Sequence, residues 1–183
     1  MSEEALVRNC APTLAGLKTG SMFTCSFESR NALLASLRSF NERLRKKGLR
    51  ILPLRISDRK ALLYLYRPAR LFRDLASAEA AAVLDRCGYD PDNRAGCLRT
   101  LCRRIRTEAH FPHEVGLFLG YPVEDVCGFM ENNSCNCKCV GCWKVYGDVE
   151  AAKKKFAQYK KCTRIYCDRW ARGADIERLT VAG

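Results

Sequence analysis

Two runs rich in β-forming residues, 49–56 and 61–67, flank the tetrapeptide SDRK at 57–60. Short runs of this kind around a polar four-residue loop are typical of a β-hairpin. Both arms are apolar on both faces, which predicts a central hairpin packed on two sides. Pro53 lacks a backbone donor and therefore marks an edge or a bulge. Such a hairpin needs covering elements, so the chain is expected to combine helices with a small sheet.

Helical periodicity predicts those covering elements. Leucines and Phe40 recur at helical spacing before Gly48, which stands where a C-terminal glycine belongs. Asp90 is expected to cap one later helix, with Pro91 in its first turn, and Asp148 another. Helices are predicted over about 29–47, 69–87, 91–107 and 148–171, with short ones from Pro112 and Pro122. Strands are predicted over 21–27 and 143–146, and an edge strand over 176–181.

The length of 183 residues suits one ordinary domain, and no internal repeat or linker is evident. We therefore expect an α+β fold: a single domain over 1–183, with several helices packed on a small, mainly antiparallel sheet. The N-terminus lacks the basic start and apolar run of a secretory signal, and no apolar stretch reaches membrane-spanning length. A soluble, cytoplasmic protein is expected, without a membrane partner.

Cysteine is unusually frequent, at 12 of 183 residues. A chain of this length can bury a sufficient core without disulfides. Cytosolic thiols stay reduced, so free, metal-bound or redox-active cysteines are favoured over structural disulfides.

Four thiols fall within eight residues: Cys135, Cys137, Cys139 and Cys142. The C-x-x-C spacing of the last two lets one tight turn direct two thiolates at a single ion, as zinc–sulfur bonds of about 2.3 Å require. A closed site needs two more ligands, from Cys135 and Cys137, from Cys162 or Cys167, or from a histidine. Three interpretations remain: a structural or regulatory metal site, a redox-active dithiol or iron–sulfur site, and incidental buried or surface thiols.

Cys162 and Cys167 lie five residues apart on one predicted helix, about 140° apart around its axis. They cannot both face one ion, so one of them is expected to be uninvolved. Lys160 and Lys161 precede Cys162 and would favour its thiolate; the alternative is a solvated helix turn that carries a cysteine.

The dipeptide His113-Glu114 could supply a general acid and base. Leu117 stands where H-E-x-x-H needs its second histidine, which excludes a zincin. The alternative is a histidine that caps or packs a helix start. Gly116 and Gly120 are expected on the histidine's face, leaving space for a backbone or a ligand.

The net charge is +12, yet residues 111–150 carry two lysines and six acidic residues, or −4. A basic surface suits nucleic acid or an acidic protein partner, and otherwise is a solvated face. Arg99, Arg103 and Arg106 are spaced to form an outward stripe on one helix. With the face from Lys153 to Lys161, this stripe supports an alternative function in nucleic-acid binding.

Five segments carry a family resemblance: APTLAGLK at 11–18, FPHEVGLFLGYPVEDVCGF at 111–129, KCVGCWKVY at 138–146, YKKCT at 159–163 and LTVA at 179–182. Together they resemble the uncharacterised bacterial family called domain of unknown function 3793, over almost the whole chain. The resemblance implies no reaction. It suggests a genetic association with flavodoxin-like proteins, which would suit redox metabolism.

The resemblance also ranks the candidate residues. By this resemblance, motif positions are occupied by His113, Glu114, Cys139, Cys142 and Cys162, whereas Cys135 and Cys137 are peculiar to this chain. Metal ligands are therefore expected at Cys139, Cys142 and Cys162, with Cys135 and Cys137 optional. Relatives often carry a histidine at the position of Asn9, so an N-terminal ligand is disfavoured.

The resulting hypothesis is a cytosolic, cysteine-based metal-binding or redox-linked protein, with zinc or iron as its cofactor and an acidic partner such as a flavodoxin. Two alternatives stay open: a nucleic-acid-binding module, and an enzyme that uses His113 and Glu114 with a cysteine thiolate.

Overall fold

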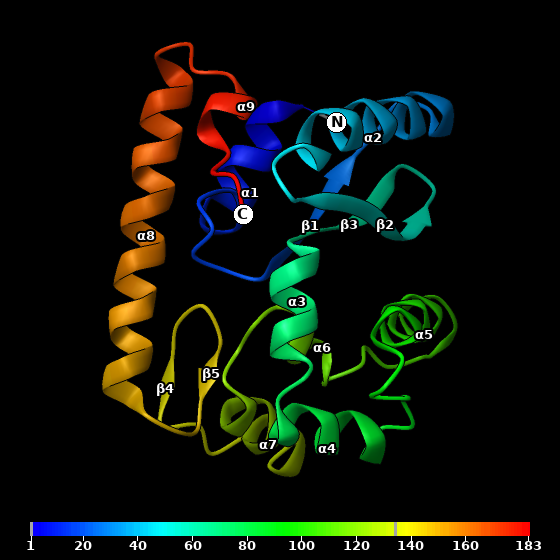
Figure 1. Ribbon diagram of the computed structural model, residues 1–183, viewed down its shortest axis with the longest axis vertical. Coiled ribbons are helices and arrows are strands. Elements are labelled where there is room, and N and C mark those ends of the chain that lie inside the picture. Colours follow the sequence, from blue (N-terminus) through cyan, green and yellow to red (C-terminus); the bar gives the residue numbers. More distant parts are fainter. Residues whose placement is uncertain (1, 134) are drawn as a thin grey trace. The chain divides into compact units, whose positions relative to one another are not determined.

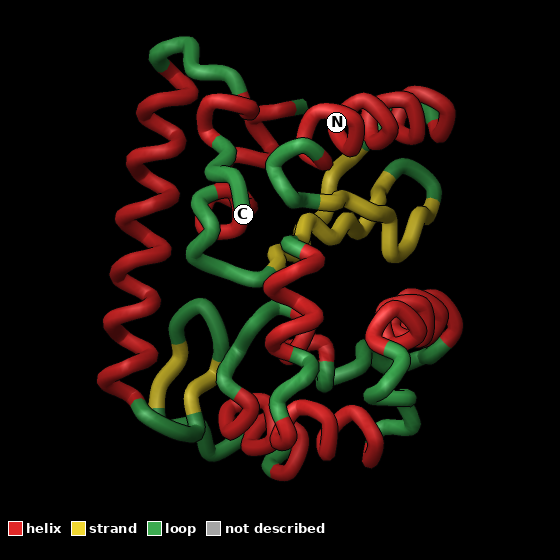
Figure 2. The backbone as a smooth tube through the Cα atoms, viewed as in Figure 1, coloured by secondary structure: helices red, strands yellow, loops and turns green. Residues whose placement is uncertain are grey.

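The computed structural model describes residues 2–133 and 135–183. Over these residues the chain forms nine helices, a three-stranded sheet and a two-stranded sheet (Figure 1). Figure 2 shows how little of the backbone is strand beside the helices. The predicted α+β class with a small antiparallel sheet is confirmed.

The chain divides into two compact units. The sheet unit comprises the residues up to Arg70 together with 159–183, and the helical unit comprises residues 71–158. The division falls inside two helices, α3 (Pro68–Asp74) and α8 (Val149–Ala171). The single-domain organisation stays a prediction.

The sheet unit is built on the predicted hairpin. Its elements are α1 (Glu3–Leu14), β1 (Gly20–Ser26), α2 (Arg30–Arg45), β2 (Arg50–Ser57), β3 (Lys60–Tyr66) and α9 (Ile176–Leu179). The strand order is β1-β3-β2, and both pairings are antiparallel. β3 is therefore the central strand and β2 an edge strand. The register shifts between Pro53 and Arg55, which confirms the bulge predicted at this proline.

The hydrophobic core cluster of the sheet unit lies on one face of the sheet. Leu63 and Leu65 alternate along β3 toward this face, in one buried cluster with Leu6 of α1 and Leu33 of α2. The predicted inward stripe of α8 packs against the same cluster through residues such as Trp170. Tyr64, on the opposite face of the central strand, is fully buried as well, as the hairpin apolar on both faces predicted. Burying these side chains is the main source of stability for this unit.

Two helices of the sheet unit differ from the prediction. α1 was not expected; the Ser2 hydroxyl accepts a hydrogen bond from the Ala5 N–H, which caps its start. The edge strand expected over 176–181 is wrong, because residues 176–179 form helix α9. The Asp175 carboxylate accepts the Arg178 N–H at 2.9 Å, and this local cap favours a helical turn over an extended strand.

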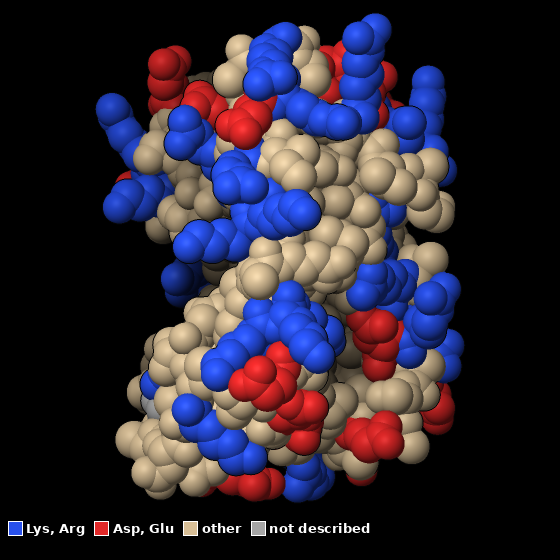
Figure 3. All heavy atoms as spheres, turned by 90° about the vertical axis from the view of Figure 1, so that its left-hand side faces the viewer, with Lys and Arg blue, Asp and Glu red and all other residues tan. Residues whose placement is uncertain are grey.

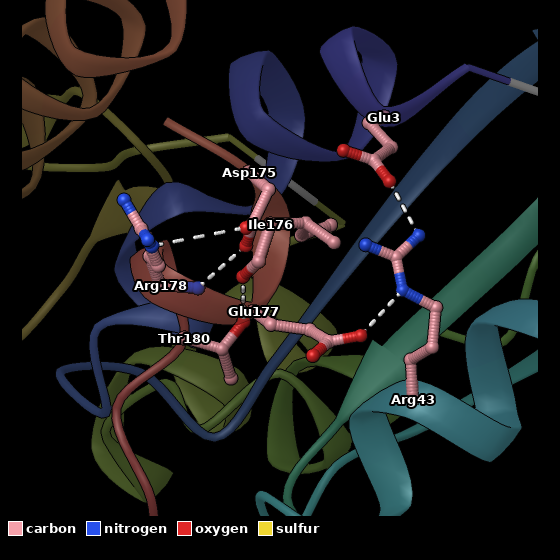
Figure 4. A network of polar contacts seen from close by, with 7 residues as sticks. All are labelled: Glu3, Arg43, Asp175, Ile176, Glu177, Arg178 and Thr180. Atoms are coloured by element: carbon pink, nitrogen blue, oxygen red, sulfur yellow. Dashed lines mark hydrogen bonds and ion pairs between the residues drawn. The ribbon is translucent and has the colours of Figure 1, made fainter. Parts of the chain in front are cut away.

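An ion-pair network joins three helices of the sheet unit (Figure 4). Arg43 of α2 lies between two carboxylates, with its Nη1 2.5 Å from Glu3 Oε1 and its Nε 2.6 Å from Glu177 Oε1. Both hydrogen bonds raise the pKa of the Arg43 guanidinium. The C-terminal helix is thereby held beside α1 and α2, although it is remote from both in sequence.

The helical unit contains α4 (Ala78–Arg86), α5 (Arg94–Thr107), α6 (Val115–Phe118), α7 (Val123–Glu131), β4 (Cys139–Val140) and β5 (Lys144–Val145). The single helix predicted over 69–87 is wrong, because this segment forms two helices, α3 and α4, with a turn between them. Ser77 caps α4 by accepting the Ala80 N–H at 3.2 Å. The cap of α5 is Asn93 rather than Asp90, whose carboxylate accepts backbone N–H groups in the preceding turn.

In the described part of the chain, no helix is both long enough and apolar enough to cross a lipid bilayer.

Candidate functional site

The candidate site is a pocket of about 490 Å³ within the helical unit. Its lining comes from the segment before α6, from α6 and α7, and from the β4–β5 hairpin. These segments coincide with two of the motifs singled out from the sequence, 111–129 and 138–146. The ring-bearing side chains of the lining are Phe111, His113, Tyr121, Phe129 and Trp143.

His113 stands at the exposed side of this pocket. Its ring meets the ring of Phe129 edge to face, with centroids 5.0 Å apart. The predicted close approach at Gly116 is also present: a Cβ built on this glycine would lie 2.7 Å from Val126 Cγ2. A glycine is therefore needed for the α6 segment to pack on α7.

The β4–β5 hairpin supplies the opposite wall. Trp143 is 8% exposed and stacks on Tyr121, with ring centroids 4.9 Å apart. Phe156 of α8 meets Trp143 edge to face at 4.5 Å. A Cβ on Gly141 would overlap the Phe156 ring, so the hairpin tip rests directly on α8. Two rings, Tyr121 from the α6–α7 connection and Phe156 from α8, thus hold the indole plane.

A buried carboxylate holds the hairpin to α7. Asp125 is 3% exposed and accepts hydrogen bonds from Trp143 Nε1 at 2.6 Å, Tyr146 N at 2.7 Å and Gly147 N at 2.8 Å. The sequence placed Asp125 only in the first turn of a helix, where acidic residues are common. Its partners lie 18 to 22 residues away in the chain, so no local pattern could reveal the contact.

The mouth of the pocket combines apolar surface with one lysine. Phe111 is 43% exposed and Val140 67% exposed. Lys144 Nζ lies over the Phe129 ring, 5.8 Å from its centroid. The pocket therefore presents aromatic walls and a cation, while the Asp125 carboxylate is engaged by three protein donors.

Glu114, the second residue of the proposed catalytic pair, does not share this pocket with His113 in the described structure. Its carboxylate is 3% exposed, and its Oε1 accepts Tyr89 Oη at 2.7 Å and Arg104 Nη1 at 2.6 Å. Burial and the bond to Glu114 raise the pKa of Tyr89 well above its usual range. Arg104 also donates to Cys87 O, so this network ties α4, α5 and the α6 segment together.

The five cysteines proposed as metal ligands differ in their exposure to solvent and in the unit to which they belong. Cys135 and Cys142 are exposed, and Cys137 and Cys139 half-buried. Cys162 is buried and belongs to the sheet unit. Burial raises the pKa of Cys162, which opposes the thiolate that Lys160 and Lys161 were expected to favour.

Among residues 2–133 and 135–183, no three His, Cys, Asp or Glu side chains are grouped closely enough to hold a metal ion. The zinc or iron site expected at Cys139, Cys142 and Cys162 therefore stays a prediction. The thiol-bearing segment 139–142 is a hairpin that walls the aromatic pocket.

The basic stripe of α5 is exposed as predicted, with Arg99, Arg103 and Arg106 all on the surface. The lysines from Lys153 to Lys161 on α8 are exposed as well. Figure 3 shows one face of the molecule, on which groups of Lys and Arg side chains lie within a mostly uncharged surface, with smaller groups of Asp and Glu. Nucleic-acid binding by these faces stays a prediction.

Comparison with known proteins identifies a family but no function. No curated protein and no solved structure matches the chain. A family described as "Protein of unknown function (DUF3793)" matches residues 6–180, nearly the whole chain and both compact units. The predicted resemblance is confirmed, and the chain belongs to the DUF3793 family.

Proposed function

We propose that the protein binds a planar aromatic small molecule that bears an anionic group, in the pocket of the helical unit. The observation that carries the proposal is a cavity of about 490 Å³ with five ring-bearing side chains and one lysine in its lining. This volume is within the usual range for small-molecule sites, which combine apolar walls with a few polar groups.

The walls favour a flat, unsaturated ligand. Aromatic pairs contribute about 0.5–1.5 kcal/mol beyond the area that they bury. Tyr121, Trp143 and Phe129 enter the lining from three segments, so a planar molecule can meet more than one ring. Phe111 and Val140, both substantially exposed at the mouth, would lose water contact when a ligand enters.

The hydrogen-bonding groups of the lining favour an anion, although its two formal charges, Asp125 and Lys144, cancel. Asp125 lines the cavity, but its oxygens already accept three N–H donors from the hairpin. Lys144 is only half-buried and can reorient its flexible stem toward a ligand. His113 at the exposed side supplies a second nitrogen donor through a ring N–H.

The framework that positions these groups is largely formed in advance. The Asp125 hydrogen bonds and the contacts of Trp143 with Tyr121 and Phe156 hold the indole plane. A rigid site loses less conformational entropy on binding, which favours affinity.

Two dyes with one ring system test the proposal: anilinonaphthalene sulfonate, which is anionic, and N-phenylnaphthylamine, which lacks the sulfonate. Trp170→Phe leaves Trp143 as the sole tryptophan, so energy transfer from Trp143 reports binding in the pocket. Lys144→Gln should weaken the anionic dye by about fivefold, near the upper end for a partly exposed ion pair, and leave the neutral dye almost unchanged.

Lys154→Gln, an exposed lysine on α8, is the matched control and should change neither affinity. If Lys144→Gln binds the anionic dye as tightly as wild type does, the anionic part of the proposal is wrong. Absence of energy transfer from Trp143 with either dye would remove the aromatic-pocket function altogether.

The cysteine-based function remains a second proposal, now centred on the Cys139 to Cys142 hairpin with Cys135 and Cys137 before it. What supports it is that these four thiols lie within eight residues and that Cys135 and Cys142 are exposed. A cytosolic location, where thiols stay reduced, belongs to the same proposal. So does an acidic protein partner such as a flavodoxin, supported by the net charge of +12 and tested by salt-sensitive retention on the immobilised partner.

A further inference from the structure

The sheet unit carries a second cavity, separate from the aromatic pocket. It is an open groove of about 810 Å³ between the C-terminal turns of α2 and edge strand β2. Its charged lining consists of Arg45 and Lys46 from the end of α2, Arg50 from the start of β2, and Glu42. Three cations and one carboxylate leave the groove with a net charge of +2.

The three cations are available to a ligand. Among the described residues, neither Arg45, Lys46 nor Arg50 forms an ion pair with an acidic side chain. Arg43, on the same helix, is held instead between Glu3 and Glu177 (Figure 4). The difference matters because a paired guanidinium must give up its protein carboxylates before it can bind another anion.

At Ile51 a side chain occupies the edge of the sheet, where an added strand would otherwise pair. The Asn41 side chain donates to Ile51 O at 2.7 Å and accepts Ile51 N at 2.9 Å. These are the two outward backbone groups with which an incoming β-strand would pair at Ile51. Recognition in the groove is therefore left to side chains, and the cations dominate it.

Apolar and aromatic surface lies beside the cations. Leu52 and Tyr66 complete the lining. Tyr66 is 7% exposed and its ring is stacked on Tyr64, with centroids 4.8 Å apart and ring planes 5° apart, so only a small part of the ring can meet a ligand. Cations that bind phosphate oxygens, next to an aromatic and aliphatic surface that binds a base or a sugar, are the two components of nucleotide recognition.

We infer that this groove binds a nucleoside phosphate, with Arg45, Lys46 and Arg50 on the phosphate oxygens and Leu52 and Tyr66 beside the nucleoside. A free nucleotide and a single-stranded oligonucleotide share this chemistry. The site is distinct from the Arg99 to Arg106 stripe, which lies on α5 in the helical unit.

The inference can be tested with the full chain, using fluorescence anisotropy of a labelled oligouridylate of about twelve nucleotides, and ADP and pyrophosphate as competitors. Three phosphate contacts predict a salt slope of about −2, so affinity should fall about 20-fold between 50 and 200 mM salt. Arg45→Gln with Arg50→Gln should weaken binding about tenfold and reduce the slope by about 1.4.

The matched control is Arg30→Gln with Arg59→Gln, which removes the same charge from two exposed positions of the same unit that do not line the groove. Circular dichroism checks that both double variants are folded. Tighter binding of the oligonucleotide than of ADP identifies the single strand as the ligand; comparable binding identifies the free nucleotide.

Three outcomes would overturn the inference. One is no binding of either probe below about 1 mM. Another is equal weakening by the two double variants, which would indicate a diffuse charge effect. The last is competition by polyglutamate as effective as that of ADP, which would assign the groove to acidic protein segments. None of these outcomes bears on the dye experiments, because the aromatic pocket uses other residues.

Discussion

The Asp125 carboxylate accepts a 2.6 Å hydrogen bond from the Trp143 indole, and both side chains are buried in the helical unit. The same carboxylate accepts two backbone N–H groups that follow β5. One side chain of α7 therefore fixes both the position of the hairpin and the orientation of the ring that walls the aromatic pocket.

Asp125→Asn should loosen the hairpin. An amide places N–H donors where the carboxylate accepted three hydrogen bonds, so at least one buried donor loses its partner, at about 1–3 kcal/mol. We expect reduced stability in urea and a shift of Trp143 emission toward longer wavelength in a Trp170→Phe background. Glu131→Gln, an exposed carboxylate at the end of the same helix, is the control. An unchanged emission spectrum would show that Asp125 does not position the indole.

Arg104→Gln should cost more stability than Tyr89→Phe. Removing the guanidinium leaves the Glu114 carboxylate buried without its cation, which costs about 3–5 kcal/mol. Removing the Tyr89 hydroxyl deletes one hydrogen bond to the same oxygen, worth about 1.5–3 kcal/mol because its acceptor is charged. Chemical denaturation of the two variants at neutral pH measures the difference. The reverse order of stability would mean that Glu114 does not depend on Arg104.

Tyr89 should also make the protein sensitive to alkali. Its pKa is raised in the folded state, mainly by burial, from an ordinary value of 10.0. The folded state then retains a proton that the unfolded state loses, so the stabilising contribution is complete below pH 10 and declines above it. Wild type should lose stability more steeply than Tyr89→Phe from pH 10 upward in denaturation curves. Parallel pH profiles for the two proteins would contradict this.

Gly116→Ala should destabilise the pocket wall. The new Cβ would lie 2.7 Å from Val126 Cγ2, and an overpacked site costs about 1–3 kcal/mol. Val126→Ala removes the methyl group that clashes, so the double variant should recover part of the loss relative to the sum of the single variants. Thermal denaturation of the four proteins completes the cycle. If the losses of stability in the two single variants simply add in the double variant, the strain does not arise between residues 116 and 126.

The thiols should react in an order set by burial. Cys135 and Cys142 are exposed, whereas Cys162 is buried with a raised pKa. With a thiol-specific disulfide reagent under native conditions, Cys142→Ser should remove part of the fast phase, and Cys162→Ser should leave it intact. Loss of the fast phase in Cys162→Ser would instead show that Cys162 is reactive, as its lysine neighbours led us to expect.

Metal content tests the cysteine-based proposal. On the cysteine-based proposal we expect about one equivalent of zinc or iron after anaerobic purification, although the described side chains as arranged form no three-ligand group. Less than about a tenth of an equivalent, even after reconstitution, would contradict the metal part of that proposal. Elemental analysis and an absorption spectrum of wild type and a Cys139→Ser/Cys142→Ser variant decide the matter. A full equivalent of metal in wild type, lost in the variant, would establish the site and require the hairpin to rearrange.

The parts of the fold that follow from neighbouring residues were predictable. The β2–β3 hairpin, the bulge at Pro53 and the end of α2 before Gly48 depend on turn chemistry and on periodicity within a few residues. The errors also had local causes: a Ser77 cap divided one helix, and an Asp175 cap made the tail helical. Predicting either feature would have required the capping preference of one residue to be weighed against the pattern of its neighbours.

The candidate site was predictable only in part. Residues 111–129 and 138–146 were singled out, and His113 does line a pocket that these segments form. The roles of Glu114 and Asp125 could not be predicted, because Arg104 and Trp143 lie 10 and 18 residues away from them. Burial of such carboxylates depends on partners that only the packed structure brings together.

By itself, the sequence determined the α+β class, most element positions, the excess of positive charge and the family, since these depend on local patterns and on composition. Only the tertiary structure decided which polar groups are buried and which face a cavity. It directed Glu114 into an internal ion pair, Cys162 into the interior and Trp143 into the pocket wall. The physical reason is that desolvation and long-range hydrogen bonds act between residues that the chain brings together only when it folds.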